Sequence, residues 1–161
     1  MTIKVGDSIP AMTLVKATAD GPAPVTTADL FGGRSVALFS VPGAFTPTCS
    51  ARHLPGYVEH AATFLRNGVD EVVCVSVNDA FVMAAWGKSA HADGKVTMIA
   101  DGNGDFSKAL GLTFDGSAYG MGIRGLRFSM IVRDGKVAEL NIEPPGAFGV
   151  SSAEHLLGQL A

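Results

Sequence analysis

The sequence of 161 residues predicts one α/β domain, residues 1–161, built on a mixed central β-sheet flanked by helices. Three observations carry this prediction. Short apolar runs alternate with segments of helical periodicity, and two alternating runs surround an Asp-Gly turn near the carboxyl end. No repeat, linker or low-complexity tract divides the chain.

The first 35 residues are punctuated by glycine, proline and threonine around the apolar run AMTLV. This pattern predicts an N-terminal extended segment or hairpin, followed by a turn through TTADLFGG. The run SVALFSVP at 35–42 is short, apolar and ended by Pro-Gly, so we expect a buried strand there.

A long helix is predicted from about Pro47 to Asn67. Its apolar residues recur at the 3.6-residue period, and Gly68 supplies a stop. These residues are Leu54, Tyr57, Val58, Ala61, Ala62 and Leu65. Pro55 is expected to kink the helix, because proline cannot donate the backbone hydrogen bond to the carbonyl of Ala51.

Two further pairs of strand and helix follow. EVVCVSV predicts a second buried strand, and Asn78 or Asp79 is placed to cap a helix over residues 80–92 that ends near Gly94. VTMIAD then predicts a third strand, and DFSKALG predicts a short helix.

The carboxyl-terminal part is predicted to be a hairpin followed by a helix. LRFSMIVRDGKVAELNIE consists of two alternating runs around Asp134-Gly135, a dipeptide typical of tight hairpin turns. A final helix is predicted to start at SSAE, where Ser151 and Glu154 form a capping box ahead of three leucines.

Composition limits the classes of function. The net charge of -3, the pI near 5.7 and the scattered Lys and Arg side chains argue against a nucleic-acid partner. The opening MTIKVGDSIP lacks the apolar core of a secretory signal, and no stretch approaches the roughly 18 apolar residues of a membrane span. We therefore expect a cytoplasmic protein, because two cysteines without a CxxC pair fit a reducing compartment.

Two glycine-rich segments imitate ligand-binding motifs. GMGIRG matches the dinucleotide-binding pattern G-x-G-x-x-G, but it leads into a hairpin where that motif needs a helix. DGNGDF resembles the start of a calcium loop, but Phe106 and Leu112 stand where the loop needs Gly and Glu. The cysteines and histidines show no ligand spacing beyond a weak Cys49/His53 pair, so we expect neither a cofactor nor a metal.

The segment PGAFTPTCSARHLPG places Cys49 in the first turn of the predicted long helix. Thr46 suits the N-cap and Pro47 the first helical position, so the N–H groups of Thr48 and Cys49 have no partner inside the helix. These donors and the positive end of the helix dipole favour a thiolate and could bind a second polar atom beside it. Taken alone, Cys49 could equally be an inert buried side chain.

Pro42, Thr46 and Cys49 form the pattern P-x-x-x-T-x-x-C, which resembles the active-site motif of the peroxiredoxins. The longer stretches PGAFTPTCSARHLPG, VSVNDAFVMAAWG and GLRFSMIV are similar to the atypical type II, peroxiredoxin-5-like branch, and the similarity extends to NIEPPG. The resemblance implies a thioredoxin fold that carries a thiol peroxidase acting on hydrogen peroxide and alkyl hydroperoxides.

By this resemblance Cys49 is the peroxidatic cysteine, whose thiolate attacks the O–O bond and becomes a sulfenic acid. The Thr46 hydroxyl contacts the peroxide, and Pro42 shields the pocket. The free N–H groups of Thr48 and Cys49 are candidate substrate-binding donors.

The resemblance also implies that Arg127, in LRFSM, stabilises the thiolate and the charge on the leaving oxygen. Arg127 alternates with Leu126 and Phe128 along a predicted strand. It is therefore expected to point to the same face as Ser129 and Ile131.

Some relatives in this branch carry a resolving cysteine just before the last helix, where this sequence has Ser151 and Ser152. Serine cannot form a disulfide, and Cys74, in the middle of EVVCVSV, is interpreted as a buried apolar filler. The resemblance therefore implies a one-cysteine mechanism in which an outside thiol reduces the sulfenic acid. Glutathione with glutaredoxin, or thioredoxin, plays that part in this branch, and the sequence does not choose between them.

Other functions compete with the peroxidase. A thioredoxin-like binding or chaperone module would have a non-catalytic Cys49, and a thiol–disulfide oxidoreductase would need the CxxC pair that the chain lacks. A hydrolase pair of Cys49 with His53 is a weak alternative, and Arg52 is interpreted as a solvated helix arginine. The joint presence of Thr46, Cys49 and Arg127 favours the peroxidase.

A homodimer with its contact beside the active site is expected. With 47% hydrophobic and 17% charged residues, the chain has more apolar side chains than one small core needs. Phe45, Phe81, Trp86 and Phe148 stand in or near loops, where aromatic residues commonly anchor interfaces. Phe81 and Trp86 could instead belong to the core of their helix. The resemblance adds support, because type II members are typically dimers that pair near the catalytic loop.

Overall fold

Seven strands form one mixed sheet, in the order β2-β1-β5-β4-β3-β8-β9, in the computed structural model, which describes residues 2–160. The elements are β1 (Thr13–Thr18), β2 (Gly21–Thr26), α1 (Thr27–Phe31), β3 (Ser35–Val41), η1 (Cys49–His53), α2 (Leu54–Arg66), β4 (Glu71–Ser76), α3 (Ala80–Ser89), β5 (Thr97–Ala100), α4 (Asp105–Leu110), β6 (Thr113–Asp115), η2 (Ser117–Tyr119), β7 (Ile123–Gly125), β8 (Phe128–Arg133), β9 (Lys136–Ile142) and α5 (Ala153–Gly158). The predicted α/β class with a mixed central sheet is confirmed.

The sheet joins two hairpins to a parallel centre. Strands β3, β4 and β5 run parallel, the N-terminal hairpin β1-β2 pairs antiparallel with β5, and the hairpin β8-β9 pairs antiparallel with β3. The predicted turn at Asp134-Gly135 is present, with φ of 49° and 75°. Such left-handed values are those that a tight turn needs to match the twist of its strands.

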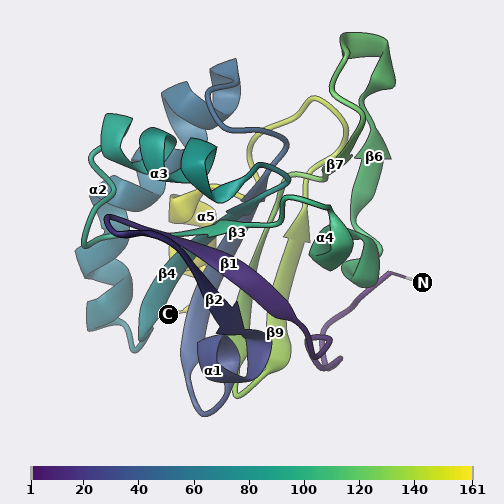
Figure 1. Cartoon of the computed structure of the whole chain (residues 1–161). Helices are drawn as coiled ribbons and strands as arrows, with labels where there is room; N and C mark the ends of the chain where they lie inside the picture. The colour runs from purple at the N-terminus through teal and green to yellow at the C-terminus, as the bar shows by residue number, and fades with distance from the viewer. Residues whose placement is uncertain (1, 161) are drawn as a thin grey trace.

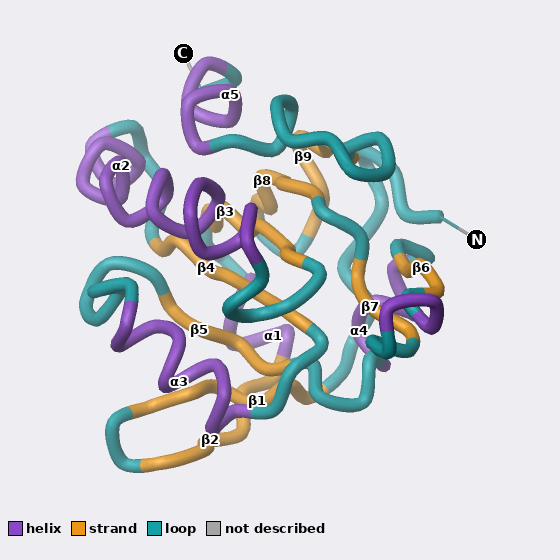
Figure 2. The backbone as a smooth tube through the Cα atoms, turned by 90° about the horizontal axis from the view of Figure 1, so that it is seen from above, coloured by secondary structure: helices purple, strands orange, loops and turns teal. Residues whose placement is uncertain are grey.

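Helices cover both faces of this sheet. Helices α2, α3 and α5 lie on one face, and α1 and α4 lie on the other (Figures 1 and 2). The central strands are therefore buried on both sides, which explains why β3, β4 and β8 are almost continuous apolar runs. One core, between the sheet and α2, α3 and α5, contains both Cys49 and Cys74.

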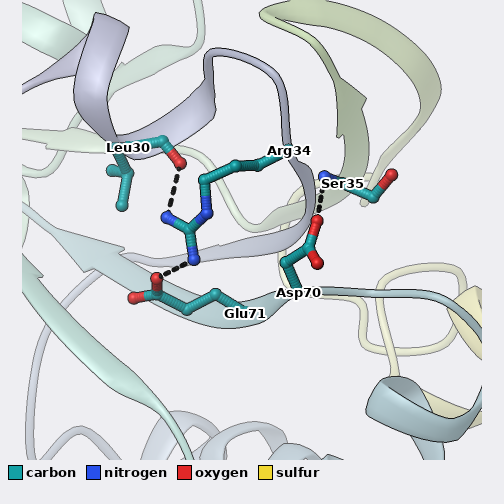
Figure 3. A network of polar contacts seen from close by, with 5 residues as sticks. All are labelled: Leu30, Arg34, Ser35, Asp70 and Glu71. Carbon is teal, nitrogen blue, oxygen red and sulfur yellow. Dashed lines mark hydrogen bonds and ion pairs between the residues drawn. The ribbon is translucent and has the colours of Figure 1, made fainter.

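A small polar network fixes the start of the parallel pair β3-β4 (Figure 3). Arg34 donates to the Leu30 carbonyl at 3.0 Å and to the Glu71 carboxylate at 2.6 Å. The Asp70 carboxylate accepts the N–H of Ser35 at 2.8 Å. Because β3 and β4 pair in parallel from this end, the network helps to fix their register. The register in turn decides which residues lie at the carboxyl ends of the two strands, just before the loop that leads to Cys49.

The helix after β4 is capped by the second of the two candidates. The Asp79 carboxylate, not Asn78, accepts the N–H of Val82 at 2.8 Å. Helix α3 ends at Ser89, earlier than the predicted end near Gly94, because a tighter turn follows it.

The predicted capping box of Ser151 and Glu154 is wrong. Ser152 caps α5, since its hydroxyl accepts the N–H of His155 at 3.2 Å. Ser151 is fully buried, and its hydroxyl donates to the Glu143 carboxylate at 2.6 Å. A partner distant in sequence therefore decides which of two adjacent serines begins the helix.

The two glycine-rich segments have structural roles. GMGIRG runs into β7 of a separate two-stranded arm, β6-β7, and the next element is the strand β8. In DGNGDF the Asp101 carboxylate accepts the N–H groups of Phe106 and Ser107, so this loop holds the first turn of α4. The arm and the short helix α1 were not predicted.

Residues 2–160 include no helix with both the length and the apolar character needed to cross a membrane. In the same residues, no three His, Cys, Asp or Glu side chains are grouped so that they could hold a metal ion.

Candidate active site

The 42–46 loop joins the carboxyl end of β3 to the helix that carries Cys49. Side chains from two other segments hold it: the Ala44 N–H donates to the side-chain oxygen of Asn78 at 2.9 Å, and Arg124 donates to the carbonyl of Pro42 at 3.4 Å. Because β3 and β4 are parallel, their carboxyl ends meet here. This edge is where ligands bind in open α/β sheets.

The helix begins at Pro47, as predicted, and Thr46 precedes it. The Thr46 hydroxyl donates to the Gly43 carbonyl at 2.7 Å instead of capping the helix, so its lone pairs remain available to a bound molecule. In the described part of the chain, the N–H groups of Thr48 and Cys49 make no hydrogen bond to a residue outside the helix. The position of Cys49 is therefore the one that the sequence predicts.

A wide π-type turn, η1, separates Cys49 from the regular helix α2. The Leu54 N–H donates to the Cys49 carbonyl, five residues back. Pro55 has no N–H, so the usual ladder of hydrogen bonds cannot pass through this point. The predicted effect of Pro55 on the helix thus takes the form of a widened turn just before it. Cys49 and His53, the first and last residues of this turn, are both fully buried.

Arg127 reaches Cys49 from the residue that precedes β8. Its Nη2 donates to Cys49 Sγ at 3.1 Å, and its Nη1 donates to His53 Nδ1 at 2.8 Å. Ile131 lies in the same core as Cys49, so the predicted face of this strand is correct. The guanidinium places one fixed N–H on the sulfur and another on the imidazole.

His53 is the site residue whose role the sequence did not reveal. A guanidinium can only donate, so Nδ1 accepts from Arg127 and the ring proton lies on Nε2, which donates to the Ser151 carbonyl at 3.0 Å. Burial, and then the charge of Arg127, lower the pKa of His53 to about 3. His53 is therefore a neutral support for Arg127, and the hydrolase-type pairing with Cys49 is wrong.

The Glu143 carboxylate holds the loop that supplies the Ser151 carbonyl. It accepts the N–H groups of Gly149 and Ser151 at 2.7 and 2.8 Å, besides the Ser151 hydroxyl. Burial pushes the pKa of Glu143 upward, but these hydrogen bonds outweigh it and leave the pKa below its ordinary value. A continuous polar chain thus runs from Glu143 through Ser151 and His53 to Arg127 and the sulfur of Cys49.

The depressed pKa of His53 predicts a loss of stability in mild acid. Above pH 6.5 the imidazole is neutral in both states, but between pH 6.5 and 3 only the unfolded chain takes up the proton. The free energy of unfolding should therefore fall by about 2 kcal/mol from this group between pH 7.5 and pH 5. Urea unfolding at the two pH values measures it.

The control for this prediction is the exposed His155. His53→Gln should reduce the pH dependence of the unfolding free energy by about the same 2 kcal/mol, whereas His155→Gln should leave it unchanged. An equal pH dependence in the wild type and in His53→Gln would contradict the buried, neutral assignment.

The Phe148 ring packs against His53 and Arg127. Its ring centroid lies 5.0 Å from that of His53, 5.9 Å from the guanidinium carbon of Arg127 and 4.7 Å from that of Arg52. Arg52 is exposed, as expected, but stacks on this ring. Phe148 therefore packs against its own chain while staying half-buried, and its role as an interface anchor stays a prediction.

Cys74 lies in β4, fully buried in the same core as Cys49, and both cysteines are free. Burial raises the pKa of the Cys74 thiol well above its ordinary value, and the nearby Cys49 acts in the same direction. The interpretation of Cys74 as an apolar filler fits this environment.

Comparison with known proteins agrees with this geometry. The Redoxin family model matches residues 4–157. Peroxiredoxin-2E-2, chloroplastic, from Oryza sativa subsp. japonica is 49% identical over 164 residues, which cover 99% of this chain and 73% of the rice protein.

Two solved structures share the fold over nearly the whole chain. Reduced Prx3 from Vibrio vulnificus in complex with H2O2 has a TM-score of 0.95 and 46% identity, covering 99% of this chain and 100% of that one. Peroxiredoxin 5 from Alvinella pompejana has a TM-score of 0.86 and 35% identity, covering 98% and 97%. With the thiol held by Arg127 on this thioredoxin-like fold, the chain belongs to the peroxiredoxins, as a thiol peroxidase of the atypical type II, peroxiredoxin-5-like branch.

Proposed function

We propose that Cys49 is the peroxidatic cysteine of a one-cysteine peroxidase that reduces hydrogen peroxide and alkyl hydroperoxides. The observation that carries the proposal is the 3.1 Å contact between Arg127 Nη2 and Cys49 Sγ. A guanidinium at this distance favours the thiolate, which is the nucleophilic form of cysteine. The H2O2 bound in the Vibrio vulnificus relative supports hydrogen peroxide as one substrate.

In the proposed reaction the Cys49 thiolate attacks one peroxide oxygen, the O–O bond breaks, and the other oxygen leaves as hydroxide or alkoxide and takes up a proton. The lone pairs of Thr46 accept the peroxide O–H and orient it. Arg127 and the N–H groups of Thr48 and Cys49 stabilise the charge that grows on the oxygens. Pro42, half-buried at the start of the loop, shields the thiolate from water.

The sulfenic acid is then reduced from outside. Cys74 is buried and its thiol stays protonated. In the region before the last helix, where some relatives carry a resolving cysteine, this chain has Ser151, whose hydroxyl donates to Glu143, and Ser152. Glutathione with glutaredoxin, or thioredoxin, is the proposed reductant, and the cytosol is a compartment that supplies these thiols. Peroxide consumption by the pure protein with each donor in turn tests the activity and identifies the reductant.

Excess peroxide without a reductant is expected to carry Cys49 from the sulfenic to the sulfinic acid, with no disulfide inside one chain. The reason is that no second reactive thiol reaches the sulfenic acid. Intact mass under non-reducing conditions should show the addition of two oxygens and no loss of two hydrogens. Cys74→Ser is the control and should give the same oxygen count; a stable Cys49–Cys74 bond in the wild type would contradict the one-cysteine mechanism.

We also propose a homodimer that pairs beside the 42–46 loop. Phe45 and Phe81 support this, because 53% and 71% of their surfaces are exposed. Phe45 is held outward by a left-handed backbone with φ of 63°, an uncommon conformation for a residue other than glycine. Trp86, in contrast, is 1% exposed and donates to the Ser50 hydroxyl, so it belongs to the core and its proposed place in the interface is wrong.

Phe45→Asp is expected to convert this dimer to a monomer, because it places a charge at the apolar centre of the contact. Sedimentation at micromolar concentration measures the oligomeric state. Leu65→Asp is the matched control, since Leu65 is 54% exposed but lies at the far end of α2, and it should leave the dimer intact. A monomeric wild type, or an undisturbed dimer in Phe45→Asp, would contradict this placement.

A further inference from the structure

Two arginines, three residues apart, reach the active site from the same segment of the chain. Arg127 donates to Cys49 Sγ at 3.1 Å, whereas Arg124, in β7, reaches the loop that joins β3 to the helix of Cys49. The reaction proposed for Cys49 gives Arg124 no part. Its contacts nevertheless lead to the residue that is proposed to orient the peroxide.

The Arg124 guanidinium binds backbone carbonyls and no carboxylate. Its Nη1 donates to the carbonyl of Val77 at 3.0 Å and to that of Pro42 at 3.4 Å, and its Nε donates to that of Met121 at 2.9 Å. Within the described residues it forms no ion pair, although the side chain is half-buried. Pro42 and Val77 directly follow the parallel strands β3 and β4, so one guanidinium ties the two strand ends together.

The contact of Arg124 with the loop extends to Thr46 through two consecutive carbonyls. Arg124 holds the carbonyl of Pro42, and the next carbonyl, that of Gly43, accepts the Thr46 hydroxyl at 2.7 Å. Gly43 is packed tightly between the two side chains, because a Cβ placed there would lie 3.2 Å from Arg124 Nη1 and 3.2 Å from Thr46 Cγ2. A shift of the Pro42 carbonyl would therefore move the acceptor on which the Thr46 hydroxyl depends.

The strand that carries Arg124 is itself packed closely against the rest of the domain. Gly125 is buried, and a Cβ placed there would lie 2.9 Å from Ser107 Oγ of α4 and 3.2 Å from Ser40 Oγ of β3. Glycine in a strand allows such a close approach of another element. Arg124 therefore extends from a base that is held in place, which is a condition for precise positioning of a functional group.

We propose that Arg124 is a positioning residue for peroxide reduction, which fixes the Thr46 hydroxyl through the backbone of Pro42 and Gly43. This role rests on the proposed function, in which the lone pairs of Thr46 accept the peroxide O–H. With Arg124 in place the hydroxyl keeps donating to the Gly43 carbonyl, so its lone pairs stay directed at the peroxide. Without Arg124 the Pro42 carbonyl loses its donor, the loop moves, and the peroxide is no longer aligned for attack.

The experiment compares two reactions of the same sulfur. Oxidation of Cys49 by hydrogen peroxide is followed through the fluorescence of Trp86, the single tryptophan, whose indole N–H donates to the Ser50 hydroxyl at 2.9 Å. Alkylation of Cys49 by iodoacetamide is timed by mass spectrometry. Alkylation needs the reactive sulfur but no oriented peroxide, so it separates the role of Thr46 from that of the thiolate.

Arg124→Gln should slow the oxidation roughly ten- to hundredfold, since displacement of a positioning group by about 1 Å can cost about 10²-fold in rate. The alkylation rate should stay unchanged, because Arg127 Nη2 still donates to Cys49 Sγ. Arg124→Lys keeps the charge and a single donor group, so it should recover part of the oxidation rate. Arg66→Gln removes an equal charge at the carboxyl end of α2 and should leave both rates unchanged.

A double-mutant cycle with Thr46→Val tests the route. Because Arg124 acts through Thr46, adding Arg124→Gln to Thr46→Val should cause little further loss of the oxidation rate. Losses that multiply, equal losses of oxidation and alkylation in Arg124→Gln, or a folded Arg124→Gln that oxidises at the wild-type rate would each overturn the inference. If thermal unfolding shows that Arg124→Gln does not fold, the same cycle with Arg124→Lys decides. Failure of wild-type Cys49 to react with peroxide would instead overturn the proposed function itself.

Discussion

Cys49→Ser is expected to abolish peroxide reduction, with a loss of more than roughly a thousandfold in the rate. A serine hydroxyl does not ionise near neutral pH, so the Arg127 guanidinium, which lies 3.1 Å from the sulfur, has no anion to stabilise. The oxygen would also form no stable product equivalent to the sulfenic acid. Peroxide consumption in the presence of an excess of reductant measures the effect.

Cys74→Ser is the matched control for this experiment. Cys74 is fully buried and burial raises the pKa of its thiol, so we expect it to take no part in the attack on peroxide. The first turnover of Cys74→Ser should equal that of the wild type, provided that thermal unfolding shows a folded protein. Loss of that turnover in a folded Cys74→Ser, or residual turnover in Cys49→Ser, would contradict the assignment of a single reactive cysteine.

Local sequence signals were sufficient for most of the sheet and for the place of the thiol. Strands β3, β4 and β8 are buried on both faces, so each is an apolar run that needs no tertiary information to recognise. The turn at Asp134-Gly135 is equally local. Pro47 at the first helical position fixed the position of Cys49 in the first turn, and the family resemblance connected it to Arg127 across 78 residues.

The support behind Arg127 could not be predicted in the same way. His53 is 74 residues from Arg127 and 98 residues from Ser151, and a lone buried histidine carries no local pattern that names its partners. The capping prediction failed for a similar reason. Ser151 donates its hydroxyl to Glu143, which lies outside the helix, so Ser152 caps α5 instead. Contacts between loops decide these positions, and periodicity does not encode such contacts.

The polar chain behind the active site explains why a charged group can point at the buried sulfur. The Arg127 guanidinium donates one N–H to Cys49 and one to His53. Burial and the charge of Arg127 keep the imidazole neutral, and the Ser151 carbonyl orients it by accepting its Nε2–H. Glu143 holds that carbonyl through the backbone beside it. Each donor is therefore fixed before a peroxide arrives, which is the condition under which hydrogen bonds lower a reaction barrier most.

Arg127→Gln is expected to slow the oxidation of Cys49 by hydrogen peroxide roughly 10²- to 10³-fold, the range found when one fixed donor to a developing negative charge is removed. The shorter amide cannot reach both Cys49 Sγ and His53 Nδ1, which the guanidinium bridges at 3.1 and 2.8 Å. Arg127→Lys should recover only part of the rate, because a single ammonium lacks the planar fork that serves both atoms. Stopped-flow fluorescence of Trp86 measures the oxidation step.

The matched control is Arg133→Gln, an exposed arginine at the carboxyl end of β8, the strand that Arg127 precedes. It changes the net charge of the protein by the same amount as Arg127→Gln, so any effect of overall charge on the approach of peroxide appears in both variants. The rate should fall only in Arg127→Gln, while the unfolding free energies of the two variants show whether the strand is intact. A folded Arg127→Gln that oxidises as fast as Arg133→Gln would show that the contact with Cys49 stabilises neither the thiolate nor the transition state.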